Sequence, residues 1–487
     1  MKEQEIIIHP EGEEGFEFRF TPSGGTYHLV SGEEELTPYG GLVAFDHFLK
    51  QAGIVETLAS FYPKARASPN ATPVGDILKG VMVNFLLGGT RFAHQRRFQD
   101  DRAVAQILGP KRGRFNSEDA FRRLVEKLTQ EEMRSWMSTG EDFIYYATPS
   151  SYIADWDSTV ITKYGEQEDT EIGYNPRKPG RKSLHPLVCV IADTRLALHM
   201  SWRPGNTVSS TNWVEAMEEV YKNPLAQERL TLNRGDIGFG QEKIMAWHEV
   251  EGLKRPQYLF KLKLTKNVKR AIAQIEWPER LASENRVEIE QIAELELKLQ
   301  GWSTARRVVV TRLIRESKDG GQNQLWDIPE VQYQAYVTNL RIDQADGSQV
   351  VLCYRKRADS ENVFDELKNQ WGFEGFSSRK AVVAESASRL LLIVYNLWSL
   401  FVRVLSERDG HTEAVTSRYE LLMLPGRLVK SGRQKTVKLS IGEKLRNHLK
   451  AAYTRLQEWL QVTAPQLRLY GENESSWSLF LPEPLPS

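Results

Sequence analysis

The spacing of hydrophobic and polar positions changes along the chain, and each change predicts a different structural unit. Residues 1–40 alternate polar and apolar side chains on either side of Gly24-Gly25, which predicts short strands or hairpins. Across residues 41–148 the apolar positions recur at helical spacing instead. Alternation returns in residues 149–264, where strand-like and helical stretches follow one another. We therefore expect a small β segment, then a helical domain, then an α/β domain.

The order of elements in the α/β domain is informative. The pattern predicts strands at Tyr152–Ile161, His185–Ala192 and Leu196–Trp202, a helix at Asn212–Tyr221, a strand at Leu230–Asp236, a helix at Gln241–Val250 and a strand at Tyr258–Leu264. Three strands, a helix, a strand, a helix and a strand is the order of a ribonuclease H-like core, a mixed five-stranded sheet with helices. In that core one carboxylate lies on the first strand and another just after the fourth. Asp157 and Asp236 occupy these two places.

Residues 265–350 interrupt this core with a largely β insertion. Arg307–Ile314 and Val331–Asn339 have the composition of strands, whereas the glutamate-rich stretch Glu284–Leu299 is compatible with a helix.

The core is expected to resume in residues 351–405, which contain a buried helix at Glu385–Leu405. Residues 406–487 form a basic and helical C-terminal region, with one helix at Leu445–Leu460 and a proline-ended terminus. The whole chain is thus predicted to be an α/β protein with helical regions before and after its core.

Charge is balanced overall, with 64 Lys and Arg against 64 Asp and Glu, but it is unevenly distributed. Between Arg427 and Lys450 there are eight Lys or Arg and the single acidic residue Glu443. The helical stretch 41–148 also carries arginines near short turns. Such local patches are typical of proteins that bind nucleic acid, and we interpret residues 41–148 as a helical DNA-binding domain.

Several classes of site are excluded by the sequence. Two cysteines allow neither a disulfide framework nor a Cys-x2-Cys zinc site. No phosphate-binding Gly-x4-Gly-Lys-Ser/Thr loop is present, so no ATP requirement is expected. The most apolar run, Leu390–Val402, is too short to span a bilayer. We expect a cytoplasmic, nucleoid-associated protein with no membrane partner.

One short segment carries four functional side chains at helical spacing: Tyr354, Arg357, Glu361 and Lys368. At about 100° per residue they fall within one stripe of a helix roughly 60° wide. A carboxylate flanked by cations suits a metal ligand beside a bound phosphate. A surface helix with i,i+4 ion pairs would show the same spacing.

This segment resembles the Tyr-x2-Arg-x3-Glu-x6-Lys signature of a group of bacterial insertion-sequence transposases of the DDE type. The resemblance extends to other motifs, which are Asp157-Ser-Thr159, Gly165-x-Gln167, Gly173-Tyr-Asn-Pro176, Gly180-Arg181, His185-Pro-Leu187, Arg234-Gly-Asp236-Ile-Gly-Phe239 and Tyr336-Val-Thr-Asn-Leu340. Ile237 departs from the family pattern, which more often has Ser or Ala there. The resemblance implies that Asp157, Asp236 and Glu361 are the catalytic carboxylates.

Carboxylate oxygens are the ligands that Mg²⁺ prefers, and two such ions can activate a water and stabilise the leaving oxygen of a phosphodiester. We therefore expect Asp157, Asp236 and Glu361 to bind two Mg²⁺ ions, with Mn²⁺ as an alternative. Asp155 lies on the same strand face as Asp157 and is the other candidate for the first aspartate. The Ser-Thr that follows Asp157 favours Asp157.

Cations near these motifs are candidates for DNA contacts. One loop has four of them, Arg177, Lys178, Arg181 and Lys182, which would hold phosphates on the DNA flank; an exposed loop is the alternative reading. The resemblance implies that Tyr354, Arg357 and Lys368 hold the phosphates of the transposon end. Trp302 and Trp326 are counterparts of the tryptophan on which relatives stack a flipped base, or simple core residues.

The predicted function is metal-dependent cleavage and strand transfer of an insertion sequence at its terminal inverted repeats. The resemblance implies double-stranded DNA partners, both inverted repeats and target, and a homodimer that holds two ends together. A non-catalytic DNA-binding or regulatory protein derived from a transposase is the alternative, and a stand-alone nuclease of the same fold is a third reading.

Overall fold

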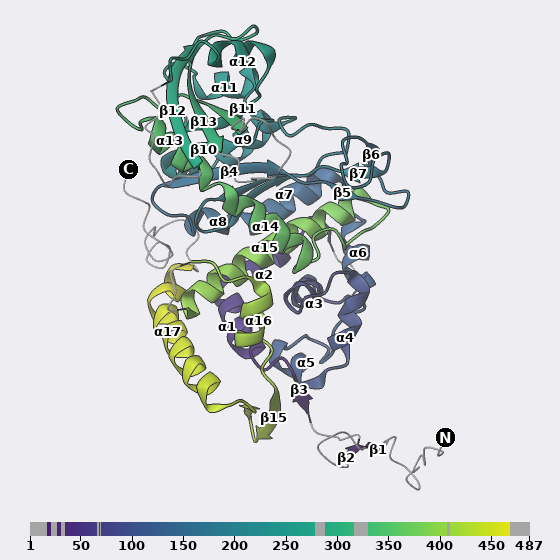
Figure 1. The fold of residues 1–487 in the computed structure, drawn as a ribbon. Coiled ribbons are helices and arrows are strands. Elements are labelled where there is room, and N and C mark those ends of the chain that lie inside the picture. Colours follow the sequence, from purple (N-terminus) through teal and green to yellow (C-terminus); the bar gives the residue numbers. More distant parts are fainter. Residues whose placement is uncertain are drawn as a thin grey trace, which may run out of the picture.

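The computed structural model describes residues 17–20, 27–30, 35–65, 68, 70–277, 288–315, 330–406 and 410–467 of the chain. A large sheet with its helices occupies one end of this part, and a group of helices occupies the other (Figure 1). The long helix α15 (Ala381–Leu405) runs between them.

The N-terminal part changes from strands to helices as the pattern predicts. β1 (Glu17–Phe20) pairs antiparallel with β2 (Tyr27–Val30). The helices that follow are α1 (Leu42–Ala52), α2 (Ile54–Ser60), α3 (Val74–Leu86), the 3-10 helix η1 (Phe92–Gln95), α4 (Arg96–Gln99), α5 (Arg102–Leu108), α6 (Asp119–Val125), α7 (Gln130–Glu141) and α8 (Phe143–Tyr146). Thr129 and Glu132 form a capping box that starts α7. Gly140 lets α7 approach α2, because a Cβ there would lie 2.7 Å from the Leu58 side chain.

The large sheet has eight strands in the order β12-β13-β14-β11-β10-β4-β8-β9. Five of them are the predicted core strands: β4 (Tyr152–Ser158), β8 (Leu187–Ile191), β9 (Ala197–Ser201), β10 (Leu230–Gly235) and β11 (Gln257–Leu262). β8 is antiparallel to its neighbours β4 and β9, whereas β10 runs parallel to β4 and β11. Cys189 on β8 is a fully buried core residue.

The helices of this region follow its strands in sequence. They are α9 (Trp213–Tyr221), α10 (Pro224–Arg229), α11 (Glu242–His248) and α12 (Lys266–Ile272). Trp213 and Trp247 meet edge to face with ring centroids 5.6 Å apart, so α9 and α11 pack against each other. A second, smaller sheet has the order β5-β7-β6 and consists of β5 (Ile161–Thr162), β6 (Glu171–Ile172) and β7 (Lys182–Leu184).

Residues 288–338 contribute the other three strands, so the sheet is larger than the five strands expected. They are β12 (Glu288–Leu297), β13 (Arg306–Arg315) and β14 (Glu330–Thr338). β14 pairs antiparallel with β11, so these three strands extend the same sheet.

The stretch Glu284–Leu299, whose composition is compatible with a helix, forms the strand β12 over residues 288–297, and residues 284–287 lie outside the described residues. Four of its glutamates, at positions 288, 290, 294 and 296, are separated by even numbers of residues. This is the period of a strand with one polar face, and pairing with β13 along its whole length outweighs the helix propensity of glutamate.

Helix α15 is the buried helix predicted at Glu385–Leu405, and every one of its residues is buried. It packs against α3, α7, α17 and the edge strand β9. The Asn396 amide accepts from the Ala197 backbone N–H at 2.8 Å and donates to the Ala197 carbonyl at 2.7 Å. The side chain thus satisfies backbone groups on the free edge of the sheet.

Among the described residues, α15 alone has the length and hydropathy to cross a bilayer. Its apolar window is buried inside the protein throughout, so its composition is weak evidence for a membrane span.

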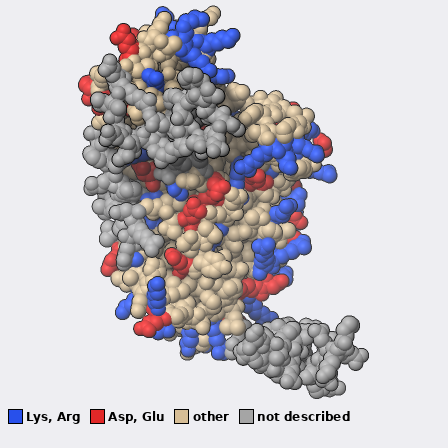
Figure 2. Space-filling model, in the orientation of Figure 1, with Lys and Arg blue, Asp and Glu red and all other residues tan. Residues whose placement is uncertain are grey.

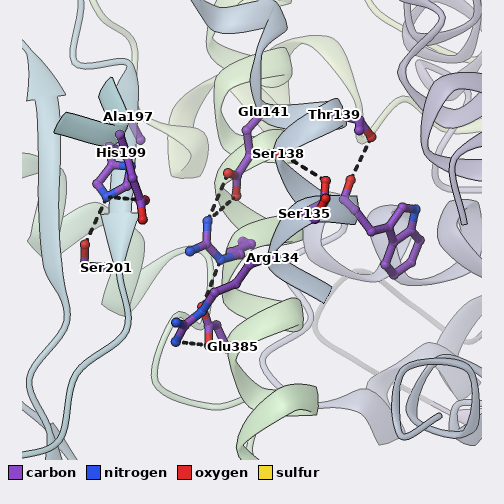
Figure 3. A network of polar contacts seen from close by, with 12 residues as sticks. Arg134, Ser135, Ser138, Thr139, Glu141, Ala197, His199, Ser201 and Glu385 are labelled. Atoms are coloured by element: carbon purple, nitrogen blue, oxygen red, sulfur yellow. Dashed lines mark hydrogen bonds and ion pairs between the residues drawn. The ribbon is translucent and has the colours of Figure 1, made fainter. Parts of the chain in front are cut away.

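A network of partly buried ion pairs joins α15 to α7 (Figure 3). Glu385, which is fully buried, accepts hydrogen bonds from Arg134 at 2.8 and 3.0 Å. Arg389 bridges Glu385 at 3.1 Å and Glu141 at 3.0 Å. Each charge in this interface therefore has a partner of opposite sign, which offsets its loss of hydration.

The C-terminal region contains a hairpin that the sequence did not predict. β15 (Gly426–Ser431) and β16 (Gln434–Leu439) pair antiparallel and form a three-stranded sheet with β3 (Leu36–Thr37). The short helix α16 (Ala414–Leu421) precedes the hairpin, and α17 (Glu443–Leu467) follows it. α17 confirms the helix expected at Leu445–Leu460.

Candidate active site

Two aspartates meet at the carboxyl ends of neighbouring parallel strands. Asp157 is the penultimate residue of β4, and Asp236 directly follows β10. The register pairs Gly235 with Trp156, so the next residue on each strand is one of the two aspartates. Parallel strands are about 4.8 Å apart, which brings the two carboxylates within reach of one another.

The Asp157 carboxylate is largely buried, with its side chain 19% exposed. One oxygen accepts a hydrogen bond from the Ser158 backbone N–H at 2.7 Å, and the other lies 3.0 Å from the Arg357 guanidinium. Burial raises the pKa of Asp157 to about 6, against the opposing effect of Arg357 and with a smaller contribution from the nearby charge of Asp236.

Asp236 opens a tight turn that leads into α11. Its Oδ1 accepts from the Gly238 backbone N–H at 2.9 Å. Gly235 is required by packing, because a Cβ there would lie 2.6 Å from the Phe239 ring. Ile237, the departure from the family pattern, is 47% exposed, so the turn tolerates a larger side chain at this position.

Asp155, the other candidate for the first aspartate, is held in a buried ion pair. Arg234 donates two hydrogen bonds of 2.7 Å to its two carboxylate oxygens, and both side chains are 1% exposed. Arg234 also donates to the Cys353 carbonyl. The carboxylate is fully engaged by this arginine, which favours Asp157 as the site residue.

The signature segment forms two helices, in place of the single helix that the spacing predicted. α13 (Gly347–Arg355) ends after Tyr354, and α14 (Ala358–Asn369) begins with Arg357 at its N-cap. The break at residues 356–357 lets Arg357, only 6% exposed, pair with Asp157 and donate to the Trp156 carbonyl at 3.1 Å. Glu361 lies on α14, and its side chain is outside the described residues.

The two remaining signature residues have different surroundings. The Tyr354 ring packs on Tyr336 of β14 with centroids 4.7 Å apart, and burial raises the pKa of its hydroxyl. The Lys368 ammonium donates to the Val160 carbonyl at 3.3 Å and lies 2.9 Å from Glu374. Arg357 therefore contacts an aspartate of the site directly, whereas Lys368 contacts the chain just beyond β4.

The basic loop predicted to clamp phosphates joins β6 to β7 in the small sheet, and it does not contact the aspartates. Arg177, Lys178 and Arg181 are exposed. Lys182 pairs with Glu166 at 2.9 Å, and the Arg181 guanidinium lies 5.8 Å from the Tyr164 ring centroid. Lys and Arg side chains gather over this part of the surface in Figure 2.

Sequence reasoning gave no role to two buried groups beside the site. The Lys163 ammonium donates to the Glu374 carbonyl at 3.1 Å and the Ser377 hydroxyl at 2.7 Å, and burial lowers its pKa to about 8. Burial also lowers the pKa of His185, against a hydrogen-bonding contact of 2.8 Å with the Thr207 carbonyl. His185 stands in a motif of the resemblance, which was the available signal, whereas Lys163 had none.

Trp302, a candidate for base stacking, lies 5.1 Å from the Arg306 guanidinium and packs partly on the core. Trp326 lies outside the described residues. Among the side chains that the structure describes, no three His, Cys, Asp or Glu gather closely enough to hold an ion, and this set does not include Glu361.

Comparison with known proteins matches most of the chain to one family model. The family model described as transposase DDE domain group 1 matches residues 30–461. No curated protein matches the sequence. The cryo-EM structure of the piggyBac transposase synaptic complex with hairpin DNA aligns over 94% of this chain and 89% of that chain, at 13% identity and a TM-score of 0.40.

Proposed function

Because the chain belongs to the transposase DDE domain group 1 family, we propose that it cuts and joins DNA as a cut-and-paste transposase of the Tyr-Arg-Glu-Lys group. Its substrates are the terminal inverted repeats of an insertion sequence and a target duplex. The five strands β4, β8, β9, β10 and β11 serve as its ribonuclease H-like core.

The adjacency of Asp157 and Asp236 is the observation that carries this proposal. Two carboxylates on neighbouring strand ends form a site of concentrated negative charge that favours cations, and the charge of Asp236 contributes to the raised pKa of Asp157. An all-oxygen donor set suits Mg²⁺, and Asp157, Asp236 and Glu361 are the residues that would hold it. Divalent ions bound there would activate a water and stabilise the leaving oxygen.

Residues of the chain itself position this site. Arg357 holds one oxygen of Asp157, while the Ser158 N–H holds the other, so the carboxylate has a fixed orientation before DNA arrives. Tyr354, Arg357 and Lys368 then contact phosphates of the element end, with Arg357 dividing its donors between Asp157 and the DNA. The exposed loop with Arg177, Lys178, Arg181 and Lys182 contacts the flanking backbone.

The proposed reaction needs two ends held together, and a homodimer is the simplest assembly that does so. Residues 41–148 would read the inverted repeat through their helices. The protein would act in the cytoplasm on nucleoid DNA, without ATP.

Substitution of single carboxylates tests the proposal. We expect Asp157→Asn, Asp236→Asn and Glu361→Gln each to reduce Mg²⁺-dependent cleavage of end-containing DNA at least about a thousandfold, as for loss of a catalytic group in other enzymes. Binding of the same DNA, measured by mobility shift, should remain within a few-fold of the wild type.

The control is Asp193→Asn, an exposed aspartate in the β8–β9 turn, which should cleave as the wild type does. Cleavage retained in any one of the three carboxylate variants would refute its catalytic role. A wild-type protein that binds ends but never cuts them would instead support the non-catalytic DNA-binding alternative.

A further inference from the structure

The pairing of β4 with β10 ends one residue before the two aspartates. The last pair in the parallel register is Trp156 with Gly235, and Asp157 and Asp236 come next. β4 continues beside β8 as far as Ser158, whereas the chain after β10 turns toward α11. Backbone pairing between β4 and β10 therefore leaves the separation of the two carboxylates to be set by other contacts.

Two serine hydroxyls meet at this point. The Ser158 Oγ lies 2.9 Å from the Ser209 Oγ, within hydrogen-bond distance, and both residues are half-buried. Successive side chains of a strand point to opposite faces of the sheet, so the Ser158 side chain lies on the face opposite the Asp157 carboxylate. The hydroxyl pair therefore supports the end of β4 from behind this aspartate.

Ser209 also packs against the turn that carries Asp236. A Cβ at Gly238 would lie 2.9 Å from the Ser209 Cβ and 3.3 Å from its hydroxyl oxygen, so the turn and this serine are in close contact. The Gly238 N–H is the group that donates to the Asp236 carboxylate at 2.9 Å. Ser209 thus contacts Ser158 on one side and the peptide that orients Asp236 on the other.

The connection between β9 and α9, which carries Ser209, is held in place by the buried Arg203. The Arg203 guanidinium donates to the carbonyls of Val208 at 3.4 Å and Ser209 at 3.0 Å, and also to that of Thr211. Its Nε donates to the His185 carbonyl at 2.9 Å. Hydrogen bonds from a charged donor are stronger than those between neutral groups, so Ser209 stands on a fixed scaffold.

His185 joins the same connection to the surroundings of the candidate site. Its Nδ1 lies 2.8 Å from the Thr207 carbonyl oxygen. Burial lowers the pKa of His185, and the charges of Asp236 and Lys368 also act on it, so its ring lies near both of these residues. The β9–α9 connection therefore borders the candidate site, although none of its residues was singled out by the sequence.

We propose that Ser209 is a positioning residue that sets the separation of Asp157 and Asp236. It does so through its hydrogen bond with Ser158 and its packing on Gly238. This inference rests on the proposed function, which makes the two aspartates ligands of divalent ions. Such ions need both carboxylates at a fixed distance, and contacts that hold metal ligands from behind contribute to metal affinity.

Binding of Mn²⁺ to the full-length protein, followed by the loss of the EPR signal of free Mn²⁺, tests the proposal without relying on activity. Ser209→Ala should weaken Mn²⁺ binding about fivefold, the equivalent of one hydrogen bond. Ser158→Ala should have the same effect, and the double variant should be no weaker than either, because both substitutions remove one shared hydrogen bond. The Mg²⁺ concentration for half-maximal cleavage should rise by the same factor, while the melting temperature stays close to that of the wild type.

Gly238→Ala tests the packing contact, because its new Cβ must displace Ser209, and it should weaken Mn²⁺ binding at least as much as Ser209→Ala does. The matched control is Ser210→Ala at the next half-buried serine, whose hydroxyl makes no hydrogen bond within the part of the chain that the structure describes; it should bind Mn²⁺ as the wild type does.

An equal loss of Mn²⁺ affinity in the Ser209→Ala and Ser210→Ala variants would overturn the proposal, and so would fully additive effects of the Ser158 and Ser209 substitutions. If the wild type binds Mn²⁺ and cuts end-containing DNA while Ser209→Ala binds Mn²⁺ equally well, only this inference fails. A wild type that binds no Mn²⁺ and cuts no DNA refutes the proposed function as well.

Discussion

Asp155 and Asp157 share one strand face, and their substitution is expected to give opposite phenotypes. Asp155→Asn removes the charge that balances Arg234, and both side chains of this pair are 1% exposed. Removing one partner of a buried ion pair typically costs about 3–5 kcal/mol, because the other charge is left without compensation. Asp157→Asn also takes an ion-pair partner from the buried Arg357, but this arginine keeps the nearby charges of Asp155 and Asp236, and the lost carboxylate is one whose charged form burial disfavours. We therefore expect a smaller loss of stability than for Asp155→Asn.

The expected size of the effect can be converted into a melting temperature. An unfolding entropy of about 2.1 cal/mol/K per residue gives roughly 1 kcal/mol/K for 487 residues unfolding as one unit. A loss of about 3–5 kcal/mol then lowers the melting temperature by about 3–5 °C, and by more if the sheet unfolds alone.

Differential scanning calorimetry and a cleavage assay below the transition, run on the same preparations, separate the two aspartates. Asp155→Asn should have the lower melting temperature and still cut DNA, whereas Asp157→Asn should melt closer to the wild type and not cut. Asp155→Leu with Arg234→Met is the compensating control, and it should be less destabilised than Asp155→Leu alone because no buried charge is left unpaired. A stable Asp155→Asn protein without activity, beside an active Asp157→Asn protein, would refute this assignment.

Three further outcomes are expected. A hydrogen bond from Arg306 lowers the pKa of Glu242 to about 2, so the ionised Glu242 stabilises the fold above pH 4.5 and this stabilisation is lost as the pH falls toward 2. Because Glu242 is 30% exposed, we expect the free energy of unfolding, measured by chemical denaturation, to fall by only about 1–2 kcal/mol over this range. The Glu242→Gln variant should not show this pH-dependent decrease. Arg389→Met should cost about 3 kcal/mol in the same assay, because Glu141 and Glu385 lose a shared partner, and a change below 1 kcal/mol would contradict the role of the network. Chelation with EDTA should abolish cleavage but leave end binding intact, and Mg²⁺ or Mn²⁺ should restore it; metal-independent cleavage would argue against the proposed ion site.

The positions of Asp157 and Asp236 could be predicted because each depends on local pattern. Alternation places Asp157 at the end of a strand, and glycines on either side of Asp236 mark the turn after another. The pairing of Asp155 with Arg234 could not be predicted in the same way, because it depends on the register of two strands nearly eighty residues apart in sequence. Asp155 and Arg234 are charged residues of opposite sign inside apolar strands, and this pattern indicates that each needs a charged partner.

The errors came from contacts between distant segments. The break before α14 accompanies the burial of Arg357 against Asp157. The spacing of residues along one helix face does not indicate such a contact with a distant strand. The helix propensity of its glutamates suggested that β12 could be a helix, but its pairing with β13 makes it a strand. The C-terminal hairpin was hidden by its lysines, which are common at exposed strand edges.

The burial of α15 has a consequence for synthesis of the protein. The apolar faces of α3 and α7 pack on a helix that begins at residue 381, more than two hundred residues after α7 ends. At about 5–20 residues per second, the ribosome needs roughly 10–50 s to make that interval. During this time α3 and α7 have been synthesised but α15 has not, so their apolar faces remain exposed to water. Nascent chains truncated before residue 381 should therefore bind chaperones, and release should coincide with the emergence of α15.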